Sequence, residues 1–163
     1  MSKFMTLDAT VLDASDMGEG ELFTFNDTEG PLGRGANLGA DQLIAQENYA
    51  NNSGKGWVTV TRNGQEIYKI SVGDSSPISS LRGLWVFDNH WVLETAFVKT
   101  RQVGNTIYSD PTGQITLDGE LLNEKQGYEE AFNFQTINDR PFYLFKKAGK
   151  IDAWYDGQII PLG

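Results

Sequence analysis

The sequence predicts an all-β fold: an antiparallel meander of hairpins that forms a sandwich or a distorted barrel, with one short helix near residues 40–50. Pairs such as Asn-Gly, Asp-Gly and Asp-Asn recur between short runs rich in β-branched and aromatic residues. The hydrophobic fraction of 39% and the charged fraction of 21% leave room for many small polar residues, as is typical of a turn-rich globule. The length of 163 residues fits a single domain, residues 1–163, with about nine to eleven strands.

The clearest hairpin is "WVTVTRNGQEIYKISV", residues 57–72, which reverses at Asn63-Gly64. A type I′ turn needs positive φ at both central residues, and Asn followed by Gly reaches this conformation at the lowest steric cost. A two-residue turn then pairs Arg62 with Gln65, Thr59 with Tyr68 and Trp57 with Ile70. In this register the expected core face consists of Trp57, Thr59, Tyr68, Ile70 and Val72.

A second hairpin is predicted in "GLWVFDNHWVLETAF", residues 83–97, which contains the only histidine and two of the four tryptophans. A turn at Asp88-Asn89 pairs Phe87 with His90 and puts His90 on the face that carries Val92. A three-residue turn over 88–90 would instead place His90 in the loop, and both remain open. With the shorter turn, the opposite face carries Leu84, Val86, Trp91, Leu93 and Phe97.

Further turns are expected at 110–113, 118–119, 138–139, 148–149 and 156–157, where Asx, Pro or Gly interrupts the strand-like runs. The alternation of Phe132 and Phe134 with polar residues predicts a half-buried strand, and Pro141 belongs at a strand start or edge. Residues 83–163 contain a faint repeat of four strands, which resembles a β-propeller blade. The chain can supply about three such units, fewer than a propeller needs, so a sandwich or barrel is favoured.

The segment 29–53 is the exception to this pattern. "EGPLGRGANLG" (29–39) reads as a glycine-rich loop, and "ADQLIAQENYA" (40–50) has helix-forming composition with Leu43, Ile44 and Glu47 at helical spacing. The loop does not have the glycine spacing of a phosphate-binding motif, because Leu38 stands where a third glycine is required. We therefore expect a surface loop followed by one helix.

Charge and composition exclude several functions. Thirteen basic and 22 acidic residues give a net charge of −9, which repels nucleic acid and anionic membrane surfaces. The absence of cysteine and the single histidine argue against a transition-metal site, and no cofactor is expected. The chain as given has neither a signal-peptide pattern nor an apolar run of ~20 residues, so we expect a soluble protein whose compartment the sequence leaves open.

Asp88, Asn89, His90 and Glu94 form the densest group of acid–base residues. No nucleophile motif such as G-x-S-x-G accompanies them, so no residue is predicted to be catalytic and turn formation explains Asp88 and Asn89. The alternative is a glycan-acting hydrolase that uses two carboxylates. Its candidate residues are Asp88, Glu94, Asp152 and Asp156, with His90.

The surplus of aromatic residues favours a non-enzymatic recognition module. Aromatic side chains edged by Asp and Asn hold sugar rings, and an apolar patch with a polar rim suits a protein partner, although packing in the core is a competing explanation. A third reading is a structural subunit that assembles with another chain or with copies of itself through an open sheet edge. The expected contacts to a carbohydrate or protein ligand are Trp85, Asp88, Asn89, His90, Trp154, Tyr155 and Asp156.

Overall fold

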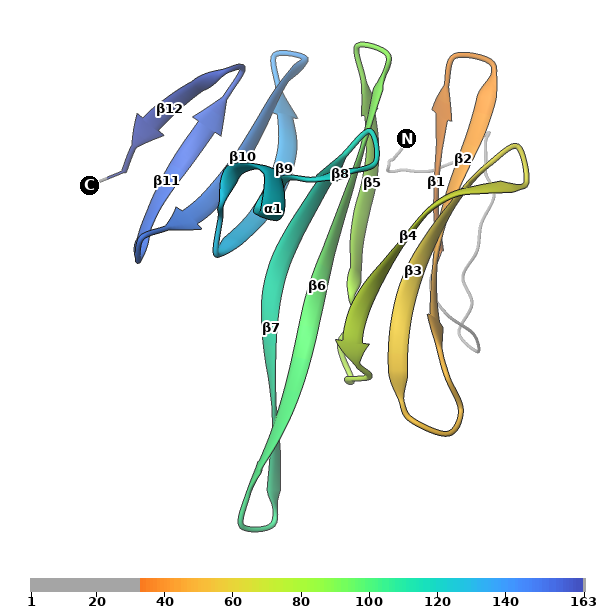
Figure 1. Cartoon of the computed structure of the whole chain (residues 1–163). Coiled ribbons are helices and arrows are strands. Elements are labelled where there is room, and N and C mark those ends of the chain that lie inside the picture. Colours follow the sequence, from red (N-terminus) through yellow and green to blue (C-terminus); the bar gives the residue numbers. More distant parts are fainter. Residues whose placement is uncertain (1–32, 163) are drawn as a thin grey trace.

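The computed structural model describes residues 33–162, which form two antiparallel β-sheets and one short helix (Figure 1), confirming the all-β prediction. The larger sheet has the order β1-β2-β3-β4-β6-β7-β8, with β5 paired to β6, and the smaller has the order β12-β11-β10-β9. The elements are β1 (Gly33–Leu38), β2 (Asp41–Tyr49), β3 (Lys55–Arg62), β4 (Gln65–Asp74), β5 (Leu81–Phe87), β6 (His90–Val103), β7 (Thr106–Leu117), β8 (Glu120–Leu121), α1 (Leu122–Gln126), β9 (Glu130–Ile137), β10 (Arg140–Lys147), β11 (Lys150–Tyr155) and β12 (Gln158–Pro161).

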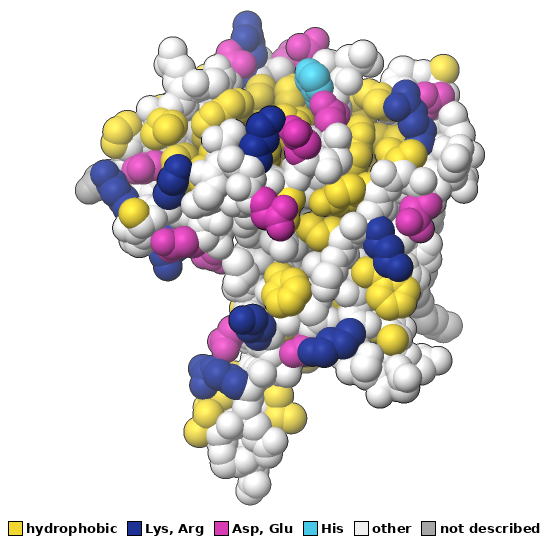
Figure 2. All heavy atoms as spheres, viewed as in Figure 1, with side chains coloured by type: hydrophobic (Ala, Val, Ile, Leu, Met, Phe, Trp, Pro, Cys, Tyr) yellow, Lys and Arg dark blue, Asp and Glu magenta, His cyan; other side chains and the backbone are white. Residues whose placement is uncertain are grey.

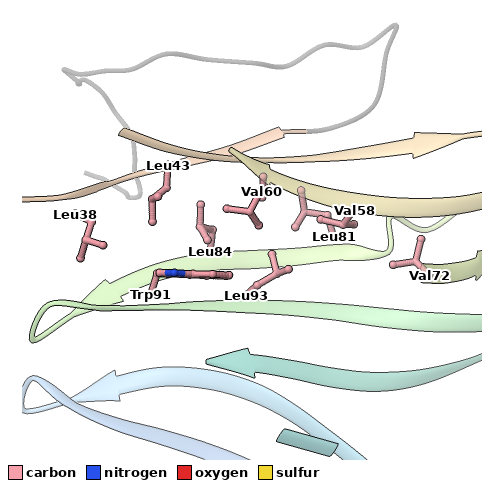
Figure 3. Close-up of a cluster of buried hydrophobic side chains, with 10 residues drawn as sticks. Leu38, Leu43, Val58, Val60, Val72, Leu81, Leu84, Trp91 and Leu93 are labelled. Carbon is pink, nitrogen blue, oxygen red and sulfur yellow. The ribbon is translucent and has the colours of Figure 1, made fainter. Parts of the chain in front are cut away.

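The larger sheet curls into a half-barrel around one hydrophobic core. Strand β6 pairs with β5 along its first half and meets β4 further along, at the parallel bridge between Gly73 and Val98. A Cβ atom on Gly73 would lie 2.2 Å from the Val98 carbonyl oxygen, so only glycine allows this close approach. The curl brings β5 near β1, and the enclosed core (Figure 3) contains Leu38, Leu43, Val58, Val60, Val72, Leu81, Leu84, Trp91 and Leu93.

The smaller sheet packs against the outer face of β5, β6 and β7, so β6 is buried on both faces. Trp91 and Leu93 point into the half-barrel, whereas Val92 between them points into a second core. This second core also contains Ile115, Leu122, Ala131, Phe134, Tyr143 and Phe145. The architecture thus combines the predicted sandwich with the predicted distorted barrel. The larger sheet is curled like part of a barrel, and the smaller sheet covers its outer face as the second layer of a sandwich.

Most of the predicted turns are confirmed as two-residue hairpin turns with positive φ. Asn63 and Gly64 have φ of 51° and 86°, and Asp88 and Asn89 have φ of 43° and 65°. The second hairpin has the register expected for the shorter turn, with Phe87 opposite His90 and Leu84 opposite Leu93. The turns at 118–119, 138–139, 148–149 and 156–157 are also present.

The predicted turn at 110–113 is wrong, since β7 runs through it and pairs with β6 as far as Thr106. The chain reverses instead at 104–105. Pro111 is tolerated within β7 because, among residues 33–162, no strand pairs with the other side of β7 at this point, so the missing N–H costs no ladder bond. Residues 99–110 of this hairpin project beyond the body of the protein (Figure 1), and we call them the arm.

The predicted helix at 40–50 and the loop at 33–38 are also wrong, because these residues form β2 and β1. Leu43, Ala45 and Glu47 are buried in alternation, which is the period of a strand. Pairing of β2 with both β1 and β3 outweighs its helical propensity. Residues 29–32 of the expected loop lie outside the described residues, and the one helix found is α1 at Leu122–Gln126.

The predicted core face of the first hairpin is half correct. Tyr68, Ile70 and Val72 pack on the core as expected, but β3 contributes Val58 and Val60 in place of Trp57 and Thr59. A register shift at Val60/Thr61 leaves Ile67 of β4 without a partner on β3, so Tyr68 pairs with Val60 instead of the expected Thr59, and Ile70 pairs with Val58 instead of Trp57.

The repeat in 83–163 corresponds to two four-stranded meanders. Strands β5 to β8 pair in sequence order, and so do β9 to β12. In the second unit, Phe132 is half-buried, Phe134 is buried and Pro141 is near the start of β10, as predicted.

Within residues 33–162, no helix is both long enough and apolar enough to cross a membrane.

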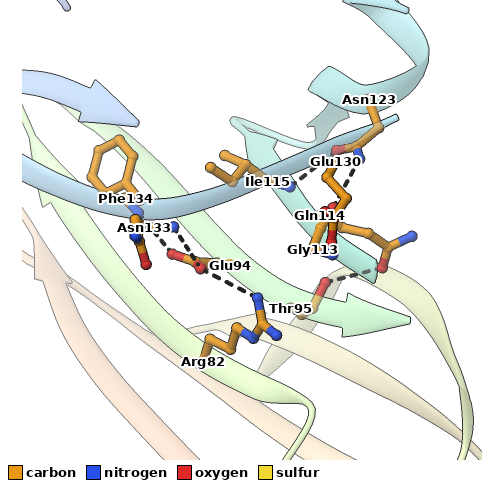
Figure 4. A network of polar contacts seen from close by, with 10 residues as sticks. All are labelled: Arg82, Glu94, Thr95, Gly113, Gln114, Ile115, Asn123, Glu130, Asn133 and Phe134. Carbon is orange, nitrogen blue, oxygen red and sulfur yellow. Dashed lines mark hydrogen bonds and ion pairs between the residues drawn. The ribbon is translucent and has the colours of Figure 1, made fainter. Parts of the chain in front are cut away.

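The two sheets are joined by side chains that bind main-chain groups (Figure 4). Glu94 on β6 is 5% exposed, and its carboxylate accepts hydrogen bonds from the backbone N–H groups of Asn133 (3.0 Å) and Phe134 (2.9 Å) on β9. These amides lie where the register of β9 with β10 shifts, with Asn133 at a φ of 57°. Arg82 lies 3.8 Å from the same carboxylate. Burial raises the pKa of Glu94, against the opposing effects of the two amides and Arg82.

Asn123 on α1 and Glu130 on β9 bind main-chain groups of β7, along the edge that pairs with no other strand of the described residues. The Asn123 side chain accepts a hydrogen bond from the Ile115 N–H (3.2 Å) and donates one to the Gly113 carbonyl (2.9 Å), as a neighbouring strand would. Glu130 accepts a bond from the Gly113 N–H (3.2 Å). A Cβ atom on Gly113 would lie 2.5 Å from the Ala131 carbonyl oxygen, so glycine is required for β9 to approach β7 this closely.

Replacing Glu94 tests whether its carboxylate joins the sheets. Glu94→Ala leaves two amides and Arg82 without their buried acceptor and is expected to lower the free energy of unfolding by about 3 kcal/mol. Glu94→Gln keeps one acceptor oxygen and should cost about 1 to 2 kcal/mol. Urea denaturation measures both, with the exposed Glu66→Ala as the control. An alanine variant as stable as the Glu66 control would contradict this role.

Asp74 makes a second link, between the end of β4 and β6. Its carboxylate forms an ion pair with Lys55 and accepts bonds from the N–H (2.9 Å) and hydroxyl (3.0 Å) of Thr100. The Lys55 bond, followed by the two bonds from Thr100, lowers the pKa of Asp74 to about 2. Because the folded-state pKa is depressed, this contribution to stability is present above the ordinary pKa and is lost as pH falls through about 2.

The pH dependence of Asp74 can be measured directly. An NMR titration of the side-chain carboxyl carbons should give a midpoint near 2 for Asp74, and Lys55→Met should move it upward toward the ordinary value of 3.8. The stability difference between the wild type and Asp74→Asn should be present at neutral pH and vanish in acid. A wild-type midpoint near 3.8 would show that the Lys55 and Thr100 contacts do not form in solution.

Candidate functional site

Three hairpin turns meet at one end of the protein and surround a cavity of about 510 Å³. They connect β5 to β6, β9 to β10 and β11 to β12 (Figure 1), so the cavity is built from both sheets. Figure 2 shows the single histidine beside acidic and basic side chains at this end. The lining residues are Phe87, Asp88 and His90 from the first hairpin, Asp139, Arg140 and Pro141 from the second, and Asp156 from the third.

Turn chemistry explains why carboxylates gather here. Asp88, Asp139 and Asp156 have φ of 43°, 62° and 48°, a region that Asp and Asn reach more easily than other residues with a side chain. Each belongs to a two-residue hairpin turn, where a short polar side chain is also tolerated because it is exposed to water. The same local requirement repeated in three turns therefore produces a group of acidic side chains around one cavity.

The two basic residues of the cavity are each held by a carboxylate. The His90 Nδ1 atom lies 2.6 Å from Asp118, and the other oxygen of Asp118 accepts a bond from the Trp91 N–H (2.9 Å). This contact fixes the imidazole, whose centre is 5.6 Å from that of the Phe87 ring. Arg140 binds Asp156 at 2.6 Å. Within residues 33–162, no protein group is hydrogen-bonded to the carboxylates of Asp88 and Asp139.

The predicted contact residues divide into two groups. Asp88, His90 and Asp156 line the cavity, and Asn89 is exposed in the same turn as Asp88. The aromatic members lie elsewhere, each half-buried and in contact with other rings. Trp85 packs on Phe134 (5.0 Å between ring centres), Trp154 stacks on Tyr143 (5.0 Å), and Tyr155 contacts Phe142 (6.5 Å) and donates its hydroxyl to the Ile137 carbonyl (2.9 Å).

The sequence did not predict five residues of the site: Phe87, Asp118, Asp139, Arg140 and Pro141. The signal for Asp139 was present in the repeat, because Asn138-Asp139 occupies the same place in its four-stranded unit as Asp88-Asn89 does in the first. Arg140 and Pro141 follow directly from that turn. Asp118 could be found only from the structure, since it reaches His90 across 28 residues of chain.

The arrangement is suited to binding polar groups that are either uncharged or positively charged. Three carboxylates accept hydrogen bonds, Arg140 donates, and Phe87 and Pro141 provide an apolar wall. Of the carboxylates considered for hydrolysis, Glu94 is buried and bound to the amides of β9, and Asp152 accepts the Leu162 N–H at 3.2 Å; neither lines this cavity. In the described part of the chain, no three His, Asp or Glu side chains are grouped closely enough to hold a metal ion.

No family model, curated protein or solved structure matches this chain. The geometry of the site is therefore the basis for assigning a function.

Proposed function

We propose that this protein is a non-enzymatic recognition module that binds a carbohydrate in the cavity between the three turns. The observation that carries the proposal is the pair of carboxylates on Asp88 and Asp139, which line the cavity without a hydrogen-bonded partner among the described residues. Sugar hydroxyl groups donate to such oxygens, and a hydrogen bond to a charged group is about twice as strong as a neutral one.

The walls of the cavity add to this argument. One face of a sugar ring consists of C–H groups, which pack against aromatic and proline rings such as those of Phe87 and Pro141. A volume of about 510 Å³ is large enough for one or two sugar rings. The excess of carboxylates over basic side chains disfavours phosphorylated or sulphated ligands, so the proposed ligand is a neutral or amino sugar.

The proposal is tested with methyl glycosides of glucose, galactose, mannose and N-acetylglucosamine. Addition to ¹⁵N-labelled protein should shift the amide resonances of the three turns for at least one sugar. Asp88→Asn and Asp139→Asn should each weaken this binding about tenfold, because asparagine keeps the turn conformation but removes the charge. Asp110→Asn, on the arm, is the matched control. Unchanged affinity in both turn variants, or no binding of any glycoside, would refute the proposal.

A second candidate function is association with another protein through the arm. Its tip exposes three apolar side chains, Val103 (56% exposed), Ile107 (67%) and Tyr108 (44%), and Figure 2 shows it projecting from the body. Arg101 covers the Tyr108 ring (4.7 Å) and binds Asp110 (2.8 Å), which orders one side of the ribbon. A two-stranded ribbon with exposed apolar residues is only marginally stable alone, so contact with a partner would stabilise it.

Sedimentation velocity over a range of concentrations tests this candidate in its simplest form, association of identical chains. The wild type should show a larger species at high protein concentration, and Ile107→Ser should shift the distribution toward monomer. Ile78→Ser is the control, since Ile78 is 78% exposed and does not belong to the arm. A monomer at every concentration would exclude self-association through the arm.

A further inference from the structure

We propose that the ligand carries a single ring or short alkyl group next to its sugar, and that this group enters an apolar cavity between the two sheets. This inference rests on the proposed function, because it extends the same site inward. The second cavity has a volume of about 140 Å³ and shares two wall residues, Phe87 and Pro141, with the turn cavity. A molecule lying across these two residues would contact both.

The inner cavity is apolar on nearly all sides. Val92 and Ile115 form its floor on the larger sheet, Trp154 lines it from the smaller sheet, and Leu122 lines it from α1. An apolar cavity of ~150 Å³ stays free of ordered water and accepts a molecule the size of benzene. The volume thus matches one six-membered ring or a short alkyl chain.

Two polar groups on its wall, those of Tyr143 and Lys125, are hydrogen-bonded within the protein, and a third, the side chain of Gln126, is exposed to water. The Tyr143 hydroxyl is hydrogen-bonded to that of Tyr128 (2.9 Å), and the Lys125 ammonium binds Glu120 (2.8 Å). Neither group needs water or a polar ligand inside the cavity. An apolar group can therefore enter without leaving a buried donor or acceptor unpaired.

The two cavities differ in the chemistry that they select. The outer one presents carboxylates, an arginine and a histidine, whereas the inner one presents aliphatic and aromatic side chains. A free sugar would fill only the outer cavity, and a simple hydrocarbon only the inner one. The ligand class that uses both is an amphipathic glycoside with a small apolar aglycone.

Matched pairs of glycosides test the inference. For each sugar of the panel, binding of the methyl and phenyl β-glycosides is compared by titration calorimetry and by ¹⁵N chemical shifts. The phenyl glycoside should bind about tenfold more tightly or better, because its ring leaves water for an apolar wall. It alone should shift the amide resonances of Val92, Ile115 and Leu122.

A cavity-filling variant provides the second measurement. Leu122→Trp should reduce the phenyl-to-methyl affinity ratio to near one while leaving methyl glycoside binding unchanged, and Ile78→Trp is the control at an exposed position. Equal wild-type affinities for the methyl and phenyl compounds would overturn the inference and leave the proposed function standing. Binding of neither compound would overturn both, and this wild-type comparison holds even if Leu122→Trp fails to fold.

Discussion

The structure depends on one buried carboxylate, that of Glu94. It lies between two sheets that share no hydrogen-bonded strands, and it accepts the two amides that the irregular pairing of β9 leaves free. A buried carboxylate without partners would cost several kcal/mol, and buried amides without acceptors would add to that cost. The carboxylate therefore requires the two amides, and the amides require the carboxylate. This mutual requirement fixes the position at which the smaller sheet packs on β6.

Other polar side chains also bind backbone groups that have no partner in a β-ladder. Glu47 on β2 is buried and accepts the backbone N–H groups of Ser80 and Leu81 (3.0 Å for the latter), where the chain enters β5. Asn123 and Glu130 satisfy the free edge of β7. In each case a side chain replaces a missing strand neighbour. The turn cavity depends on this docking, because two of its carboxylates, on Asp88 and Asp139, come from different sheets.

Local chemistry explains what could be predicted from the sequence. Turns such as Asn63-Gly64 and Asp88-Asn89 are set by the φ preferences of two residues, so they and the strands beside them were found, together with Asp88, His90 and Asp156 of the site. The segment around Leu43 has helix-forming composition, and only the presence of a strand on each side makes it β2. The sequence could not predict the role of Glu94 either, since the amides that it binds are about forty residues away along the chain.

Hydrogen exchange at two backbone amides tests the central claim, that the Glu94 carboxylate holds the sheets together. The account predicts that the amide protons of Asn133 and Phe134 exchange as slowly as those of the core strand β6, although they lie at an interruption of the β9–β10 ladder. Exchange as fast as that of the exposed turn residues Asn138 and Asp139 would contradict it.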